Sequence, residues 1–86
     1  MYTVSWSPSA ERELADIWNK ASDRAEITAA ANEIDADLAR DPLTLGEARG
    51  GHTRIVFVTP LAVLFDVEET DQSVRVWDVW RWPGQI

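Results

Sequence analysis

The stretch SVRVWDVWRW, residues 73–82, is the longest β-prone segment of the chain and sets the pattern of its fold. Successive side chains of a strand point to opposite faces of a sheet. Strict alternation gives one face to Arg75, Trp77, Val79 and Arg81 and the other face to Val74, Val76, Asp78, Trp80 and Trp82. We therefore expect the tryptophans to divide, with one or two packed inward and at least one in an exposed aromatic patch.

Three further segments have the composition of strands. YTVSW (residues 2–6) alternates large and small residues, and TRIVFVT (residues 53–59) and AVLFDVE (residues 62–68) are rich in β-formers around Pro60. Apolar residues occupy both parities of the last two segments: Ile55, Phe57, Val63, Phe65 and Val67 on one, and Val56, Val58, Ala62 and Leu64 on the other. This is more apolar sheet than two helices can cover, which predicts a partner.

Two amphipathic helices lie between the first strand and the others. The first follows Ser7 as N-cap, with Pro8 at its first position. The second follows a D-x-x-E capping box, Asp23 and Glu26, and Pro42 ends it. The glycine-rich residues 42–51 are expected to form a loop. Trp6 and Trp18 are expected to fill the core between strand and helix.

These elements predict an α+β fold of order β-α-α-β-β-β. A two-helix hairpin would pack on a mainly antiparallel four-stranded sheet, and 86 residues are enough for one domain, residues 1–86. No apolar run reaches the roughly 18 residues of a membrane span, and acidic residues occupy the start of the chain, where a signal peptide is basic and then apolar. A cytoplasmic protein that does not bind membranes is therefore expected.

The net charge of −7 and the residue types exclude several chemistries. The eight Lys and Arg residues are scattered through an acidic chain, whereas a protein that neutralises several phosphates needs clustered cations. There is no cysteine and only one histidine, His52, so neither a thiolate nucleophile nor a histidine-rich metal site can be built. No cofactor or metal is expected. The adjacent Glu68 and Glu69 are expected to form a solvated edge beside a hairpin turn.

The ordered set of segments carries a family resemblance across almost the whole chain. SPSAERELADIW follows the first strand, the second helix ends in LARDPLTLGEARGG, and TRIVFVTPLAVLFDVEE and VRVWDVWRW close the chain. In this order they resemble the RelE/ParE toxin superfamily of type II toxin–antitoxin systems, which includes plasmid stabilisation proteins. The resemblance implies a small toxin that a cognate antitoxin holds inactive.

The superfamily's nucleases use basic residues across a concave sheet face, and this chain matches them only in part. Arg54 and Arg81 fit two basic positions, and His52, two residues before Arg54, has the intrinsic pKa of a general base or acid. Ala62 stands where the third strand of the nucleases carries an arginine. The terminal Tyr or His that follows the last strand in the nucleases has no counterpart in RWPGQI.

Each of these residues also has a structural interpretation. Arg54 and Arg81 are then solvated strand ends or partners of Asp66 and Asp78, and His52 is a loop residue. On this interpretation the chain is not an enzyme; on the other it is an mRNA endoribonuclease that uses His52, Arg54 and Arg81.

Tryptophan is enriched at interface hot spots, so Arg75, Trp77, Trp80 and Trp82 are expected to bind a protein partner. The leading hypothesis is a ParE-like toxin that acts by protein binding, with DNA gyrase as the target that the resemblance implies. One alternative is a RelE-like endonuclease that acts on the ribosome. Another is a degenerate toxin-fold interaction module that forms a homodimer through the tryptophan-rich edge.

Overall fold

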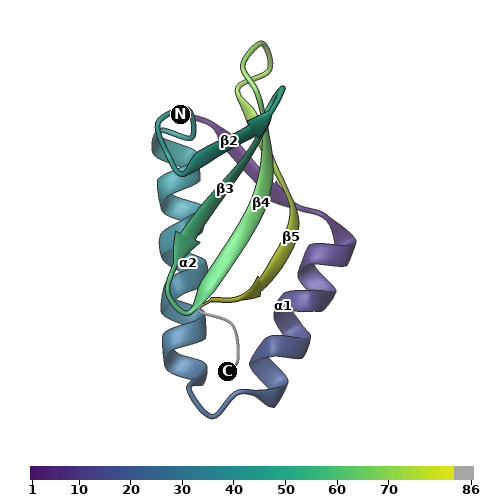
Figure 1. Cartoon of the computed structure of the whole chain (residues 1–86), viewed down its shortest axis with the longest axis vertical. Coiled ribbons are helices and arrows are strands. Elements are labelled where there is room, and N and C mark those ends of the chain that lie inside the picture. Colours follow the sequence, from purple (N-terminus) through teal and green to yellow (C-terminus); the bar gives the residue numbers. More distant parts are fainter. Residues whose placement is uncertain (83–86) are drawn as a thin grey trace.

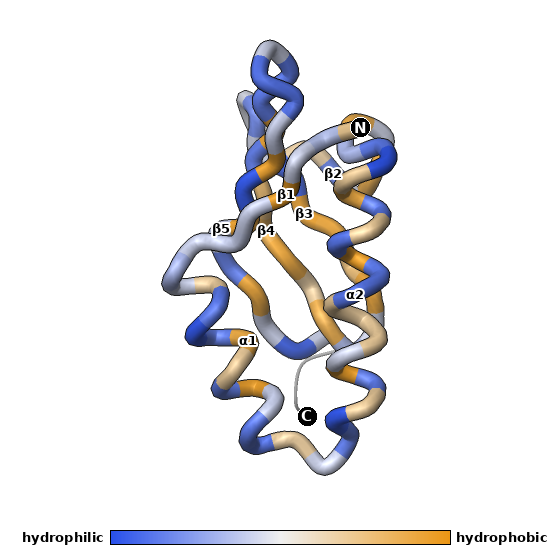
Figure 2. Tube along the Cα trace, turned by 180° about the vertical axis from the view of Figure 1, so that it is seen from behind, coloured by the Kyte–Doolittle hydropathy of each residue, from blue (hydrophilic) through white to orange (hydrophobic). Residues whose placement is uncertain are grey.

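A five-stranded sheet carries two helices on one face (Figure 1). This computed structural model describes residues 1–82. The elements are β1 (Thr3–Trp6), α1 (Pro8–Lys20), α2 (Arg24–Arg40), β2 (Glu47–Gly50), β3 (Thr53–Val58), β4 (Leu61–Glu68) and β5 (Ser73–Arg81). The strand order is β1-β5-β4-β3-β2; β1 runs parallel to β5 and every other pair is antiparallel. Seen from behind, α1 and α2 flank the middle strands (Figure 2).

The expected α+β class and element order are confirmed, and the strand count is corrected from four to five. The additional strand, β2, lies in the segment predicted to be a loop. Gly46, at a φ of 64°, turns the chain so that Glu47 pairs with Ile55 and Ala48 with Arg54. All four β2 residues are exposed, so the strand has no apolar alternation by which its sequence could reveal it.

The two helix starts differ from each other. Ser7 caps α1 as expected, because its hydroxyl accepts a 3.0 Å hydrogen bond from the Ala10 amide. The capping box expected for α2 is wrong, since the Asp23 side chain makes no cap hydrogen bond. Its carboxylate accepts hydrogen bonds from Arg81 of β5 instead, and α2 ends at Arg40, before Pro42, as predicted.

A β-bulge in β5 changes which side chains face the helices. The β4–β5 register pairs Leu64 with Asp78 but Phe65 with Val76, so Trp77 is an additional residue. Val79 is therefore buried with Val76, and the predicted single alternation through residues 73–82 is wrong. The predicted parity groups of β3 and β4 are also wrong, because even residues of one strand pair with odd residues of the next, such as Val56 with Val63.

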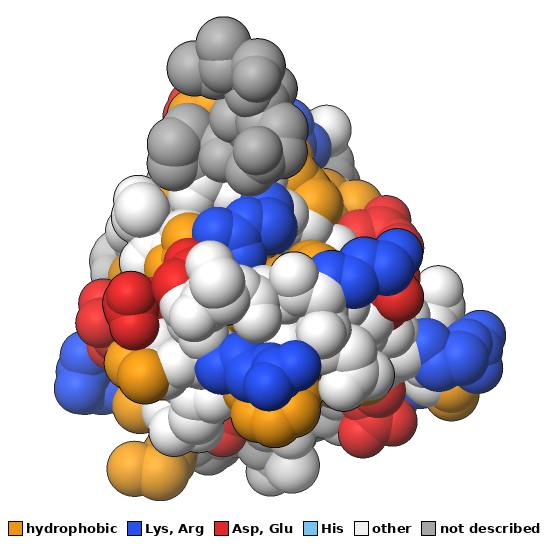
Figure 3. Space-filling model, turned by 90° about the horizontal axis from the view of Figure 1, so that it is seen from below, with side chains coloured by type: hydrophobic (Ala, Val, Ile, Leu, Met, Phe, Trp, Pro, Cys, Tyr) orange, Lys and Arg blue, Asp and Glu red, His pale blue; other side chains and the backbone are white. Residues whose placement is uncertain are grey.

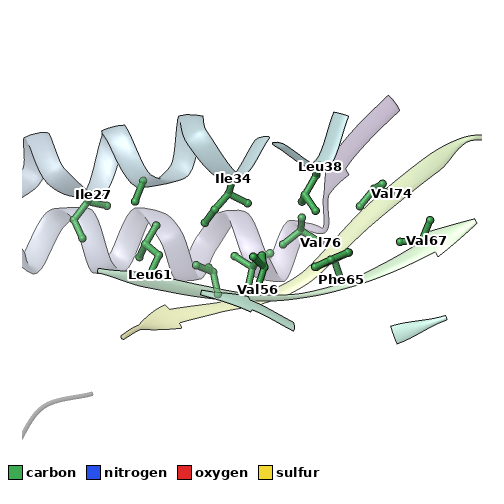
Figure 4. Packing of buried hydrophobic residues seen from close by; sticks show 13 residues of the cluster. Ile27, Ile34, Leu38, Val56, Leu61, Phe65, Val67, Val74 and Val76 are labelled. Atoms are coloured by element: carbon green, nitrogen blue, oxygen red, sulfur yellow. The ribbon is translucent and has the colours of Figure 1, made fainter. Parts of the chain in front are cut away.

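The core lies between the sheet and the helices (Figure 4). Phe65 of β4 is fully buried, and α2 contributes Ile27, Ile34 and Leu38 to the same cluster. Each such side chain stabilises the fold by about 1.5–3 kcal/mol relative to exposure. Trp6 packs against this core, but Trp18 is 40% exposed, so its predicted place in the core is wrong.

The backbone conformation and the close packing at Gly46 require glycine at this position, which a substitution can test. A Cβ built there would lie 1.8 Å from the carbonyl oxygen of Ile55, and φ is positive. We expect Gly46→Ala to lower the free energy of unfolding by about 3 kcal/mol, because the clash adds to the backbone strain. Urea denaturation measures the change.

Gly51→Ala is the matched control. Gly51 also has a positive φ, of 56°, but an added Cβ would meet nothing within 4 Å. Only the conformational strain remains, and we expect a loss of about 1 kcal/mol. Equal losses for the two variants would contradict the close approach between Gly46 and β3.

Candidate functional site

The sheet face that the helices leave uncovered carries a cluster of aromatic side chains. The register aligns Phe57, Ala62 and Trp80 in one row across β3, β4 and β5. Ala62 is fully buried, whereas Phe57 and Trp80 are 38% and 37% exposed. Trp82 contacts Phe57, with ring centroids 4.8 Å apart. We call Phe57, Trp77, Trp80 and Trp82 the aromatic face.

The β-bulge puts these rings on the same face of the sheet. Trp77, Trp80 and Trp82 are all among the exposed large hydrophobic residues, so the expectation that one or two would pack inward is wrong. In a regular strand Trp77 and Trp80 would point to opposite faces, since they are three residues apart. The additional residue cancels that inversion. Exposed apolar clusters of this kind mark interaction sites.

Trp77 is held by a network of polar groups from four strands, β1, β3, β4 and β5. Its indole N–H donates to Asp66 at 2.9 Å, and the other carboxylate oxygen of Asp66 accepts from the Thr53 hydroxyl. The Arg75 guanidinium lies 5.4 Å from the centre of the Trp77 ring and donates to the Ser5 hydroxyl. These contacts hold the Trp77 ring in one orientation. They also place the Arg75 guanidinium beside the aromatic face, where Ser5 accepts a hydrogen bond from it.

The structure does not assemble His52, Arg54 and Arg81 into one site. Arg54 donates to the carbonyls of Leu45 and Gly46, at 2.8 and 3.3 Å. Arg81 lies at the far end of the sheet, and His52 is exposed in the turn after β2. Arg54 and Arg81 pair with Phe65 and Leu61, both buried, so they lie on the sheet face that carries the helices.

Arg81 forms a two-point ion pair with Asp23. The guanidinium nitrogens lie 3.1 and 2.9 Å from the two carboxylate oxygens, which ties the end of β5 to the residue before α2. The hydrogen bonds from Arg81 hold the pKa of Asp23 below its ordinary value, and the same bonds raise the pKa of Arg81. The carboxylate that pairs with Arg81 is that of Asp23, not that of Asp78 as expected.

The charge distribution agrees with the separation of His52, Arg54 and Arg81. In the view from below, basic side chains lie apart from one another, with acidic, apolar and uncharged groups between them (Figure 3). Within residues 1–82 no three His, Cys, Asp or Glu side chains are grouped so that they could hold a metal ion. No helix in that range is long and apolar enough to cross a membrane. Glu68 and Glu69 are exposed at the edge of their turn, as predicted.

A second surface lies between α1 and α2. It is a groove with a volume of about 590 Å³, and its apolar lining includes Leu14 and Ala15 of α1 and Ile27 and Ala31 of α2. We call it the helix groove. Because it lies on the helix side of the sheet, it is separate from the aromatic face.

An indole bridges the helix groove near each end. Trp6 of β1 donates to Asp35 of α2 at 3.2 Å, and Trp18 of α1 donates to Thr28 of α2 at 3.2 Å. Thr28 and Asp35 are seven residues apart, so the two bridges are about 10 Å apart along α2. Glu11 lines the groove as well. The Trp18 bridge thus joins α1 to α2 at one end of the groove, and the Trp6 bridge joins β1 to α2 at the other.

Sequence reasoning missed the helix groove. Its α2 side is formed by Thr28, Ala31, Asn32 and Asp35, which share one face at helical spacing. The small and polar residues at these positions resemble an ordinary solvated face. A signal was present in two alanines, the exposed Ala15 and the half-buried Ala31, because small residues on facing helices leave room for another element.

Comparison with solved structures places this fold. The toxin–antitoxin complex RelBE2 from Mycobacterium tuberculosis matches with a TM-score of 0.75 and 25% identity, over 93% of this chain and 96% of that chain. The chromosomal ParDE system of P. aeruginosa matches with a TM-score of 0.72 and 14% identity, over 94% and 96%. The isolated E. coli RelE toxin matches at 0.65 and 15%, over 99% and 88%. No protein-family model and no curated protein matches the chain.

The sheet, the helix pair and their order define the fold class of small bacterial toxins that these structures represent. The chain has the fold of the RelE/ParE toxin superfamily. The position of the terminal Tyr or His of the nucleases, after Trp82, lies outside the described residues.

The Asp23–Arg81 pair predicts a pH-dependent stability. A carboxylate whose pKa is lowered in the folded state stabilises the fold above its unfolded pKa, and this contribution is lost as the pH falls through the lowered value. We expect Asp23→Asn to lower the melting temperature at neutral pH, and the difference from the parent chain to shrink below about pH 4. Thermal melts by circular dichroism across this range measure it.

Asp16→Asn is the control, since Asp16 pairs with Lys20 through side chains that are 62% and 78% exposed. Such a pair contributes little, so the melting temperature should hardly change at any pH. A difference for Asp23→Asn that persists unchanged in acid would contradict the role of the ion pair.

Proposed function

We propose that this chain, as a single domain over residues 1–86, is the toxin of a type II toxin–antitoxin system and acts in the cytoplasm by binding proteins. The observation that carries the proposal is the aromatic face, where Trp77, Trp80 and Trp82 are exposed together. Exposed tryptophan on a rigid sheet is costly in water and contributes strongly to protein interfaces. The aromatic face, with Arg75 beside it, is the proposed target-binding surface.

The basic residues support protein binding over RNA cleavage. A nuclease that attacks through the 2′-hydroxyl must stabilise charge on the phosphoryl oxygens and move two protons. Arg54 donates hydrogen bonds to backbone carbonyls and Arg81 to the Asp23 carboxylate, so both guanidinium groups have partners within the chain. His52 lies in a separate turn. Ala62, at the position of a nuclease arginine, is buried in the aromatic row instead.

The cognate antitoxin is the partner proposed for the helix groove. Two of the matched structures, RelBE2 and the E. coli RelBE complex, are toxin–antitoxin complexes. The helix groove has a mainly apolar lining with acidic and polar residues at its margins, which are the features that receive an amphipathic segment. The antitoxin and the target would then occupy opposite sides of the sheet.

The proposed mode is ParE-like, with DNA gyrase as the target class and plasmid stabilisation as the biological setting. A RelE-like endonuclease that acts on the ribosome is the second candidate, and the 25% identity to RelBE2 favours it. A homodimer through the aromatic face, in an interaction module that is not toxic, is the third. The three differ in growth, transcript integrity and oligomeric state.

Expression of the chain alone in bacteria tests the proposal. We expect growth arrest with a DNA-damage response and intact transcripts. Trp80→Ser should relieve the arrest at least about tenfold in colony count, because loss of an interface hot spot costs about 2 kcal/mol or more of binding. Leu43→Ser is the matched control, since Leu43 is 41% exposed but lies outside the aromatic face.

The outcomes separate the candidates. Transcript cleavage that Arg54→Ala abolishes would replace the proposal with the endonuclease. Absence of arrest, together with a dimer in sedimentation that Trp80→Ser dissociates, would replace it with the interaction module. Equal relief by Leu43→Ser and Trp80→Ser would remove the aromatic face from the mechanism.

A further inference from the structure

The helix groove has opposite electrostatic character at its two ends. Glu11 of α1 and Asp35 of α2 line it at the end bridged by Trp6. At the other end the Arg24 guanidinium lies 4.6 Å from the centre of the Trp18 ring. No Lys or Arg is among the groove-lining residues that the structure describes. A ligand therefore meets negative charge at one end and a cation just beyond the other.

Arg24 is held in this place by the end of α1. It donates to the carbonyl oxygens of Trp18 and Asn19, at 3.0 and 2.9 Å, and so covers the negative end of the α1 dipole. The positive charge beside Trp18 is thus a fixed part of the surface. Glu11 and Asp35 have no cationic side-chain partner among the described ion pairs.

We infer that the helix groove binds a cationic amphipathic helix, with the helix N-terminus at Glu11 and Asp35 and its C-terminus toward Arg24. This rests on the proposed function, whose antitoxin would supply the helix. A helix carries partial positive charge at its N-terminus and negative charge at its C-terminus, so this direction matches both ends of the groove. The bound helix runs antiparallel to α2 and parallel to α1.

The dimensions and the net charge select this occupant. The two indole bridges are about 10 Å apart, which is about two helical turns, so three apolar residues at spacing i, i+4 and i+7 span the groove. A second copy of this chain is the competing occupant. Its net charge of −7 opposes approach to an acidic groove, whereas Lys and Arg residues beside the apolar stripe are attracted to it.

Stapled synthetic helices test the inference on the intact chain. The first carries a leucine stripe at that spacing and lysines in its N-terminal half; the second is identical except that glutamates replace the lysines. We expect the lysine helix to bind at least about tenfold more tightly by calorimetry, and its affinity to fall as salt rises. A nitroxide at its N-terminus should broaden the amide signals of Glu11 and Asp35 more than those of Trp18 and Thr28.

Matched variants assign the effect to the groove. Glu11→Gln with Asp35→Asn should weaken the lysine helix about tenfold, and Asp35→Asn keeps an acceptor for the Trp6 indole. Glu69→Gln with Asp71→Asn removes the same charge from the exposed β4–β5 turn and should change little. Equal effects of the two double variants would overturn the inference, as would equal binding of both helices, reversed broadening, or no binding at millimolar concentration.

A dimer in sedimentation that the lysine helix displaces would also overturn it, in favour of a second copy. The proposed function is judged separately by growth arrest. Arrest without helix binding rejects the groove inference alone, and helix binding without arrest rejects the toxin alone.

Discussion

The β-bulge at Trp77 is the constraint on which both faces of the molecule depend. Before the bulge, β5 turns Val74 and Val76 toward the helices; after it, Val79 takes that direction although it is three residues from Val76. Because of this one additional residue, the valines of β5 are buried on the helix side while its tryptophans are exposed on the other face. It also turns Arg81 to the helix side, where it reaches Asp23 and ties the sheet to the helix hairpin.

The sequence was sufficient for the class and order of elements, because those depend on periodicity and capping. Ser7 and Pro42 marked helix boundaries that the structure confirms. It was not sufficient for side-chain direction in β5, since a bulge that contains no glycine leaves no mark in the alternation. Nor could it reveal β2, whose pairing comes from the turn at Gly46 and from the edge of β3 rather than from apolar residues.

The sequence could predict which residues are candidates for the site, but not which partners the fold gives them. Arg75, Trp77, Trp80 and Trp82 were predicted to bind a partner, and all three tryptophans are exposed. Arg54 and Arg81 were correctly seen as basic strand residues, but their partners come from elements distant in sequence: the carbonyls before β2 and the carboxylate before α2. Long-range pairing of this kind follows from topology, which local patterns do not encode.

The helix groove and the aromatic face lie on opposite sides of the sheet, and this constrains how a partner could inactivate a toxin of this shape. A helix bound in the helix groove lies behind the sheet and leaves Trp80 and Phe57 uncovered, since the sheet is between them. Neutralisation by occlusion therefore requires the same partner to continue around a sheet edge. β1 and β2 are the edge strands, and β2 is fully exposed and lies next to β3, which carries Phe57. A partner chain that leaves the groove must therefore cross α2 and pass β2 before it reaches β3 and the aromatic face, so the segment that joins the two surfaces follows the exposed edge of the sheet.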